Sequence, residues 1–138
     1  MTVDFFGPSR FQWTDTQLRH ANAMLQEIPA HLRTDSKGNT KTSITRPTIA
    51  EMIAADPSEA VRSAEVYGFI EKHFRIIKQF DVGGTLVNLV FTSDIINNFN
   101  PDDAAHAALI GRLYRKEREL ITAGELPSDF RFIIAELR

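Results

Sequence analysis

Four neighbouring side chains near the start of the chain have types that could bind a small polar molecule. Ser9 and Gln12 could orient a polar acceptor, and Arg10 could pair with an anionic one. Trp13 could form an apolar wall beside them. Ligands of open α/β sheets bind beyond the carboxyl ends of the strands, and residues 7–13 follow the first expected strand. Substrate contact by these four side chains is therefore one hypothesis. We favour structural roles over it, with Trp13 packing at the next helix start and Arg10 covering the sheet edge.

Arg62 is a fifth candidate for a substrate contact, because it precedes an expected helix break near Ser63. A break leaves backbone groups free, and an arginine or a ligand can satisfy them. We favour a role for Arg62 in holding two helices together over substrate binding.

The adjacent glycines of segment 83–85 (Gly-Gly-Thr) could offer backbone N–H groups to an anion at a helix start. A tight turn between a strand and a helix explains the same residues more simply. No other glycine motif suggests a phosphate site.

Metal, thiol and hydrolase chemistry find little support in the sequence. The chain has no cysteine, which excludes disulfides, thiolate catalysis and cysteine-ligated metals. No serine has the His and Asp order of a hydrolase triad, so no catalytic residue is assigned. No two histidines have a helical ligand spacing, so we expect no metal site and predict a core position for His73. The histidines are His20, His31, His73 and His106.

Composition indicates an ordinary globular chain of one domain, residues 1–138. Apolar residues make up 43%, charged residues 25%, and the net charge is −2 without a basic stripe. Nucleic acid is therefore not an expected partner. No segment resembles a signal peptide or an apolar membrane span, so we expect a cytoplasmic location and no membrane partner.

Helix signals are clear at several places. Capping boxes begin at Thr14 and Thr48, and Pro29 ends the first helix. Asp56-Pro57-Ser58-Glu59 resembles a third start, which predicts a helix to residue 73 with the apolar side chains of residues 66–73 on one stripe.

Two further helical segments are expected in the second half of the chain. Residues 85–98 are ambiguous, and we favour helix over a buried strand. A long helix starts at Asn100-Pro101-Asp102-Asp103 and ends at Gly124.

Three short strands are expected, at residues 3–6, 74–81 and 130–137. Adjacent apolar residues in the last two predict burial on both faces. A three-stranded α/β sheet is thin, and the chain reads as if it starts inside a larger fold.

Several motifs, taken in order, resemble the C-terminal half of a class I S-adenosylmethionine-dependent methyltransferase. The resemblance rests on residues 6–15 (FGPSRFQWTD), 46–47 (RP), 56–63 (DPSEAVRS), 83–86 (GGTL), 95–99 (IINNF) and 124–130 (GELPSDF). It implies a Rossmann-like sheet of seven strands in the complete enzyme. Residues 3–6 would end the fifth strand, residues 74–82 would form the sixth, and residues 130–137 the seventh, inserted antiparallel between those two.

The chain departs from that family in one respect, because it contains no Gly-x-Gly triplet among its seven glycines. The complete family holds its cofactor with a Gly-rich loop that faces a helix N-terminus. We therefore expect no cofactor-binding residue here, and S-adenosylmethionine only if a missing N-terminal half complements this truncated domain.

Two functions follow from the resemblance, and the sequence leaves open whether the chain alone is an enzyme. The first is the substrate-side half of a methyltransferase, with a small-molecule acceptor and a complementary half as partners. The alternative is a non-catalytic interaction module that derives from the same fold and forms homo-oligomers.

Overall fold

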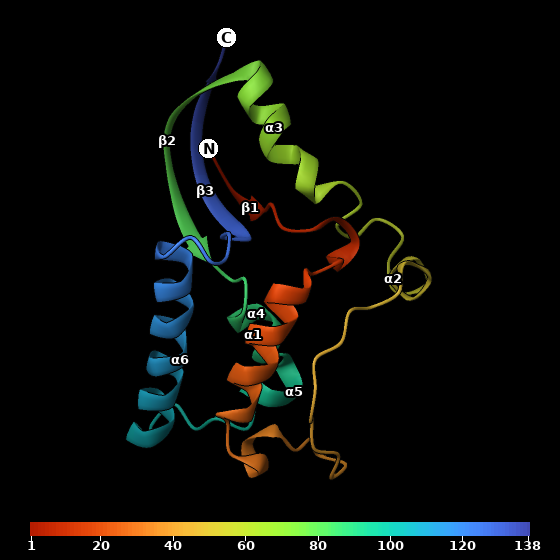
Figure 1. The fold of residues 1–138 in the computed structure, drawn as a ribbon, viewed down its shortest axis with the longest axis vertical. Coiled ribbons are helices and arrows are strands. Elements are labelled where there is room, and N and C mark those ends of the chain that lie inside the picture. Colours follow the sequence, from red (N-terminus) through yellow and green to blue (C-terminus); the bar gives the residue numbers. More distant parts are fainter. The chain divides into compact units, whose positions relative to one another are not determined.

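The computed structural model describes all 138 residues, which form two compact units (Figure 1). The sheet unit comprises Met1–Thr14, Arg46–Gly84 and Pro127–Arg138. The helical unit comprises Asp15–Thr45 and Thr85–Leu126. All five candidate binding residues belong to the sheet unit.

The sheet has three strands, β1 (Thr2–Phe5), β2 (Phe74–Gly83) and β3 (Phe130–Leu137). Their order is β1-β3-β2, and β3 runs antiparallel to both neighbours. The α/β class, the positions of the strands and the antiparallel last strand are confirmed. In Figure 1 the blue β3 lies between the red β1 and the green β2.

The two faces of the sheet differ in burial. Ile133 pairs with Thr2 and Gln79, and its side chain is only 1% exposed. On the opposite face Val3 and Phe80 both pair with Phe132, and they are 59% and 50% exposed. The prediction of burial on both faces is therefore wrong. We call the face of Val3, Phe80 and Phe132 the uncovered face.

Helix α3 (Ser63–His73) covers the buried face through Tyr67. The Tyr67 hydroxyl lies 2.9 Å from the Gln79 side-chain oxygen, and the Arg131 guanidinium lies 4.5 Å from the centre of the Tyr67 ring. An edge contact with Phe6 completes this packing. Helix α3 is thereby fixed to the sheet by one aromatic side chain with apolar and polar partners on several sides.

The predicted helix start at Asp56 is wrong. The Asp56 carboxylate accepts hydrogen bonds from the Ser58 hydroxyl and N–H, at 2.7 and 2.8 Å, which hold the pKa of Asp56 below its ordinary value. Such a bond to the residue two positions on closes a turn instead of a helix. Ala60, with φ of 47°, then interrupts any helical run, so that α3 begins only at Ser63.

Helix α2 (Ile49–Ala55) confirms its predicted capping box. The Glu51 N–H donates to the Thr48 hydroxyl, and the Thr48 N–H donates to the Glu51 carboxylate. The bonds from the N–H and hydroxyl of Thr48 lower the pKa of Glu51. No residue of α2 is buried, so the cap rather than a core contact defines this helix.

The helical unit is built from α1 (Asp15–Gln26), α4 (Val87–Val90), α5 (Ser93–Ile96) and α6 (Ala104–Thr122), with a 3-10 turn η2 (Ala30–Arg33). The preference for helix over strand at residues 85–98 is confirmed, although two short helices replace one. Its buried apolar side chains include Ala21, Met24, Leu25, Ile28, Leu86, Leu89, Val90, Ile95 and Leu113.

Both ends of α6 match their sequence signals. The Asp103 carboxylate accepts from the N–H groups of Ala105 and His106, which lowers the pKa of Asp103. At the other end Gly124 has φ of 75°, and its N–H donates to the Ile121 carbonyl. A glycine with positive φ commonly ends a helix in this way.

Gly84 provides a test of the turn that ends β2. Gly84 has φ of +76°, and a Cβ there would lie 2.4 Å from a ring carbon of Phe130. We expect Gly84→Ala to lower the free energy of unfolding, measured by urea denaturation, by about 2–4 kcal/mol. The backbone strain of an alanine at positive φ and the steric overlap of its Cβ with the Phe130 ring both contribute to this loss. Gly124→Ala is the control, since its φ is +75° but a Cβ meets nothing within 4 Å; it should cost only about 1–2 kcal/mol. Equal effects would contradict the role of Phe130.

Candidate functional site

The loop after β1 begins at a corner that only glycine fits. A Cβ on Gly7 would lie 2.5 Å from the Phe5 ring and 2.7 Å from the Asp129 carboxyl carbon. The Gly7 carbonyl accepts a buried hydrogen bond of 2.9 Å from the Ser63 hydroxyl. The Phe6 N–H donates to the Asp129 carbonyl at 2.6 Å. The corner is thus joined to the starts of both α3 and β3.

Ser9 stands at the start of a short 3-10 turn, η1 (Ser9–Phe11). Its hydroxyl oxygen accepts a 3.3 Å hydrogen bond from the Ala64 N–H in the first turn of α3. The first N–H groups of a helix lack partners within the helix, and Ser9 satisfies one of them. Ser9 therefore links the loop to α3.

Arg10 holds the segment that precedes α3. Its guanidinium donates to the carbonyls of Asp56, Pro57 and Glu59, at 3.3, 2.8 and 3.1 Å. Its own N–H donates to the Ala60 carbonyl at 2.6 Å, with Arg10 in the left-handed region at φ of 53°. Three carbonyl oxygens around one guanidinium form a clasp for residues 56–60, which favours a structural role over pairing with an anionic acceptor.

Gln12 and Trp13 continue the loop toward α1. The Gln12 amide donates to the carbonyls of Arg10 and Pro47, at 3.0 and 2.8 Å. The Trp13 ring stacks on Phe11, with centroids 5.5 Å apart. The Trp13 indole N–H is buried and donates to no acceptor. Since buried N–H donors are normally paired, this one is the exception among the polar groups of the loop.

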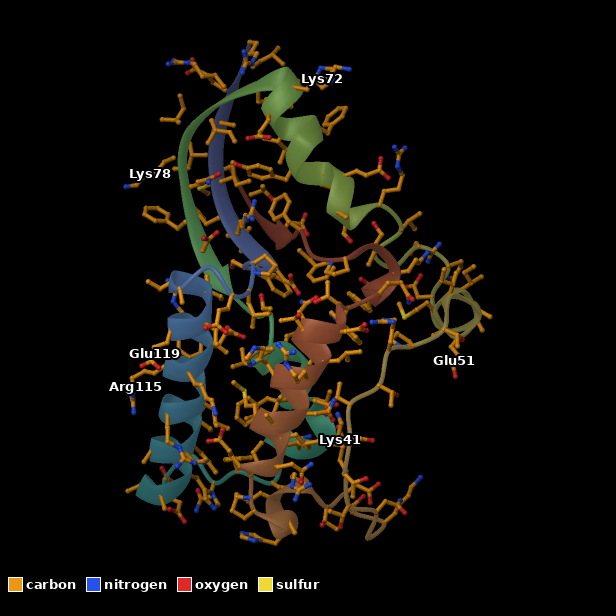
Figure 2. The ribbon with its side chains drawn as sticks, viewed as in Figure 1. Lys41, Glu51, Lys72, Lys78, Arg115 and Glu119 are labelled. Carbon is orange, nitrogen blue, oxygen red and sulfur yellow. The ribbon has the colours of Figure 1, made fainter.

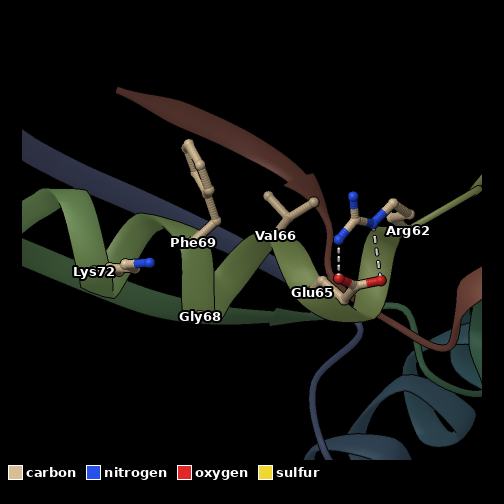
Figure 3. Close-up of a pocket in the computed structure, with 6 residues that line it drawn as sticks. All are labelled: Arg62, Glu65, Val66, Gly68, Phe69 and Lys72. Atoms are coloured by element: carbon tan, nitrogen blue, oxygen red, sulfur yellow. Dashed lines mark hydrogen bonds and ion pairs between the residues drawn. The ribbon is translucent and has the colours of Figure 1, made fainter.

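The Arg62 guanidinium makes no hydrogen bond with these four loop residues. It pairs with the Glu65 carboxylate one turn further along α3, at a nitrogen–oxygen distance of 2.9 Å for Nε, and this pairing lowers the pKa of Glu65 (Figure 3). The expectation that Arg62 holds two helices together is wrong, because its partner lies on the same helix. The structure therefore brings Ser9, Arg10, Gln12 and Trp13 together, without the Arg62 guanidinium.

Sequence reasoning missed a buried carboxylate, Glu117 of α6. Glu117 is fully buried and accepts from the N–H groups of Leu86 and Val87, at 2.6 and 2.8 Å. These donors begin α4, which has no side-chain cap of its own. An acidic residue on an otherwise apolar stripe of α6 was the available signal. Its neighbour Glu119 extends from α6 instead (Figure 2).

The donors of the turn after β2 already have acceptors within the protein. The Gly83 N–H donates to the Ser128 hydroxyl at 2.8 Å. The Leu86 N–H, three residues further on, donates to Glu117 as described above. The tight-turn interpretation of residues 83–85 accordingly fits better than an anion site.

The histidines give no sign of a metal centre. No group of three or more His, Cys, Asp or Glu side chains is placed to hold a metal ion. The prediction of a core position for His73 is wrong, because His73 is exposed and packs its ring 4.4 Å from the ring of Phe69.

No protein-family model, curated protein or solved structure matches this chain. None of the helices combines the length and the apolar character that a membrane crossing requires.

Arg10 is testable as a structural clasp. In the unchanged chain, residues 56–60 can open only if the hydrogen bonds from the Arg10 guanidinium break. Arg10→Ala removes these bonds, so we expect the hydrogen-exchange rate of the Glu59 amide and its neighbours to rise by roughly tenfold or more. Arg75→Ala, which removes an exposed arginine paired with Glu136 on the strands, is the control and should leave these amides unchanged. Unchanged exchange in Arg10→Ala would count against the clasp.

Glu117 is testable as a buried cap. Removal of this carboxylate leaves two buried N–H groups without their acceptor, so Glu117→Ala should lower the free energy of unfolding by about 2–4 kcal/mol. The control Glu119→Ala changes an exposed side chain of the same helix, with an expected effect within about 0.5 kcal/mol. Chemical denaturation measures the free energy of unfolding of both variants. Equally small losses of stability in the two would contradict the role of Glu117 as a cap.

Proposed function

We propose that this chain is the acceptor-binding half of a class I S-adenosylmethionine-dependent methyltransferase and needs a cofactor-binding half for methyl transfer. One observation carries the proposal: the strand order is β1-β3-β2, with β3 antiparallel to both neighbours. This is the arrangement that the sequence resemblance assigns to the fifth, seventh and sixth strands of the complete enzyme.

Methyl transfer to an acceptor is a direct displacement at the methyl carbon of a sulfonium. The acceptor atom forms a bond to that carbon, the carbon–sulfur bond breaks to leave a neutral thioether, and the proton of the acceptor passes to solvent water. The protein mainly has to align the two reactants. The rigid loop after β1, with the free indole N–H of Trp13, would supply part of the acceptor side.

Two surfaces of the sheet unit are suited to a complementary half. Strand β1 pairs only with β3, so its other edge presents unpaired backbone N–H and C=O groups. The second surface is the uncovered face of the sheet, on which the side chains of Val3 and Phe80 are exposed. A sheet that continues past β1 would satisfy the edge and bring helices to the uncovered face.

The residues of this chain do not fit the cofactor by themselves. The sequence has no Gly-x-Gly turn, and the Gly83 and Leu86 N–H groups of the only Gly-Gly turn donate to Ser128 and Glu117. S-adenosylmethionine is therefore expected to bind only to a complex with the second half, which would contribute the Gly-rich loop.

Calorimetry tests the proposal directly. The purified chain should give no binding heat with S-adenosylmethionine, whereas its complex with the separately expressed N-terminal half of a class I methyltransferase should bind it. Binding by the chain alone at micromolar concentration would overturn the half-enzyme proposal, and so would failure of any such half to form a complex.

Val3→Lys is the matched variant for that experiment. A charged side chain on the edge strand hinders pairing with a further strand, so complex formation should weaken by about tenfold or more. Lys78→Ala, an exposed residue of the strand at the far side of the sheet, should have no effect.

A non-catalytic oligomeric interaction module is the second candidate. It is favoured by the number of apolar side chains that the sheet unit exposes on α2, α3 and the sheet, among them Ile49, Ile53, Val66, Phe69, Ile77 and Phe80. Self-association without any cofactor-dependent partner would distinguish this candidate from the first.

A further inference from the structure

Helix α3 carries a second, outward stripe opposite the side that packs on the sheet. Glu65, Gly68, Phe69 and Lys72 follow one another at helical spacing, and Figure 3 shows them along α3. With Arg62 and Val66 they line an open groove of about 420 Å³, in which Phe69 is 60% exposed. Val66 and Phe69 belong to the apolar stripe that the sequence predicts for residues 66–73, and both are exposed, whereas Ile70 of the same stripe is half-buried.

Neither the backbone nor the packing of this chain requires a glycine at position 68. Its φ is not positive, and a Cβ there would meet nothing within 4 Å. Glycine inside a helix is less stable than alanine, because it loses more backbone freedom on folding. What Gly68 does provide is a flat place beside Phe69, where a second helix can approach closely.

The charges of the outward stripe are complementary to those of the same stripe on an antiparallel second copy. Glu65 lies toward the start of α3 and Lys72 toward its end. The Lys72 side chain has no ion-pair or hydrogen-bond partner, and the Glu65 carboxylate pairs only with the Arg62 guanidinium. An antiparallel copy of the helix would therefore place an acid opposite a base at both ends.

We propose that α3 is a self-association surface, on which a second copy of this chain packs its own α3 antiparallel. With the two-fold axis between Gly68 and Phe69, each Phe69 lies against the Gly68 of the other copy. Each Glu65 then faces the Lys72 of the other copy. Such an interface uses the same patch twice, as two-fold symmetry requires.

The expected dimer is weak. A helix of eleven residues is about 16 Å long, so the interface is smaller than a standard stable one. We expect dissociation in the range of about 10–100 μM. The proposal deepens the oligomeric candidate and rests on it for the nature of the partner, but it does not depend on methyl transfer.

Sedimentation equilibrium on the full chain, from about 1 to 500 μM, is the first test. Phe69→Glu and Gly68→Gln should each weaken dimerisation by about tenfold or more, because one loses the buried ring and the other fills the space that receives it. Phe80→Glu on the uncovered face is the control and should leave the dimer unchanged. Circular dichroism of each variant is the check that the substitution leaves the fold intact.

Charge reversal tests the antiparallel register. Glu65→Lys and Lys72→Glu should each weaken self-association, since like charges then meet at both ends. An equimolar mixture of these two variants should form heterodimers, because each lysine again faces a glutamate. The double variant should regain the affinity of the unchanged chain.

Four results would overturn the proposal or its register in distinguishable ways. A monomer at every concentration removes both the α3 interface and the oligomeric candidate. A dimer that Phe69→Glu does not weaken removes the α3 interface alone. A dimer that Phe80→Glu abolishes assigns self-association to the uncovered face instead. Absence of heterodimers in the charge-reversal mixture rejects the antiparallel register.

Discussion

The pairing of β3 with β1 on one side and β2 on the other is the constraint on which the sheet unit depends. It joins residues 2–5, 74–83 and 130–137, which are far apart in the sequence. The start of β3 also fixes the Gly7 corner, through the bond from the Phe6 N–H to the Asp129 carbonyl. Without the central strand, β1 and the corner at Gly7 would lose their connection to β2.

From that corner a continuous set of contacts leads to the candidate site. Ser63 bonds to the Gly7 carbonyl, Ser9 bonds to the first turn of α3, and Arg10 clasps the segment before it. The polar groups that the sequence offers for ligand binding are thus largely engaged in positioning backbone. The indole N–H of Trp13 remains the exception.

Local signals predicted much of the fold. The strands, the capping box at Thr48 and the glycine that ends α6 all depend on residues close in sequence, which is why their positions are confirmed. The start of α3 was missed because the Asp56 side chain and the left-handed Ala60 compete with a helix that the same residues also favour. Propensity alone does not decide between a turn and a helix start.

Features that depend on distant residues could not be read from the sequence. Glu117 caps a helix about thirty positions earlier in the chain, and neither segment indicates the other. Periodicity correctly showed that α3 has an apolar stripe, but not which side the sheet covers. Tyr67 takes the inner side, and Phe69 is left outside.

The environment of Trp13 has a practical consequence. It is the only tryptophan of the chain, and its ring lies on Phe11 with the nitrogen shielded from solvent. All indole fluorescence, and the single indole resonance in a nitrogen-15 spectrum, therefore originate at the candidate loop. Changes in either signal therefore report on the packing of Trp13 against Phe11 without any added label.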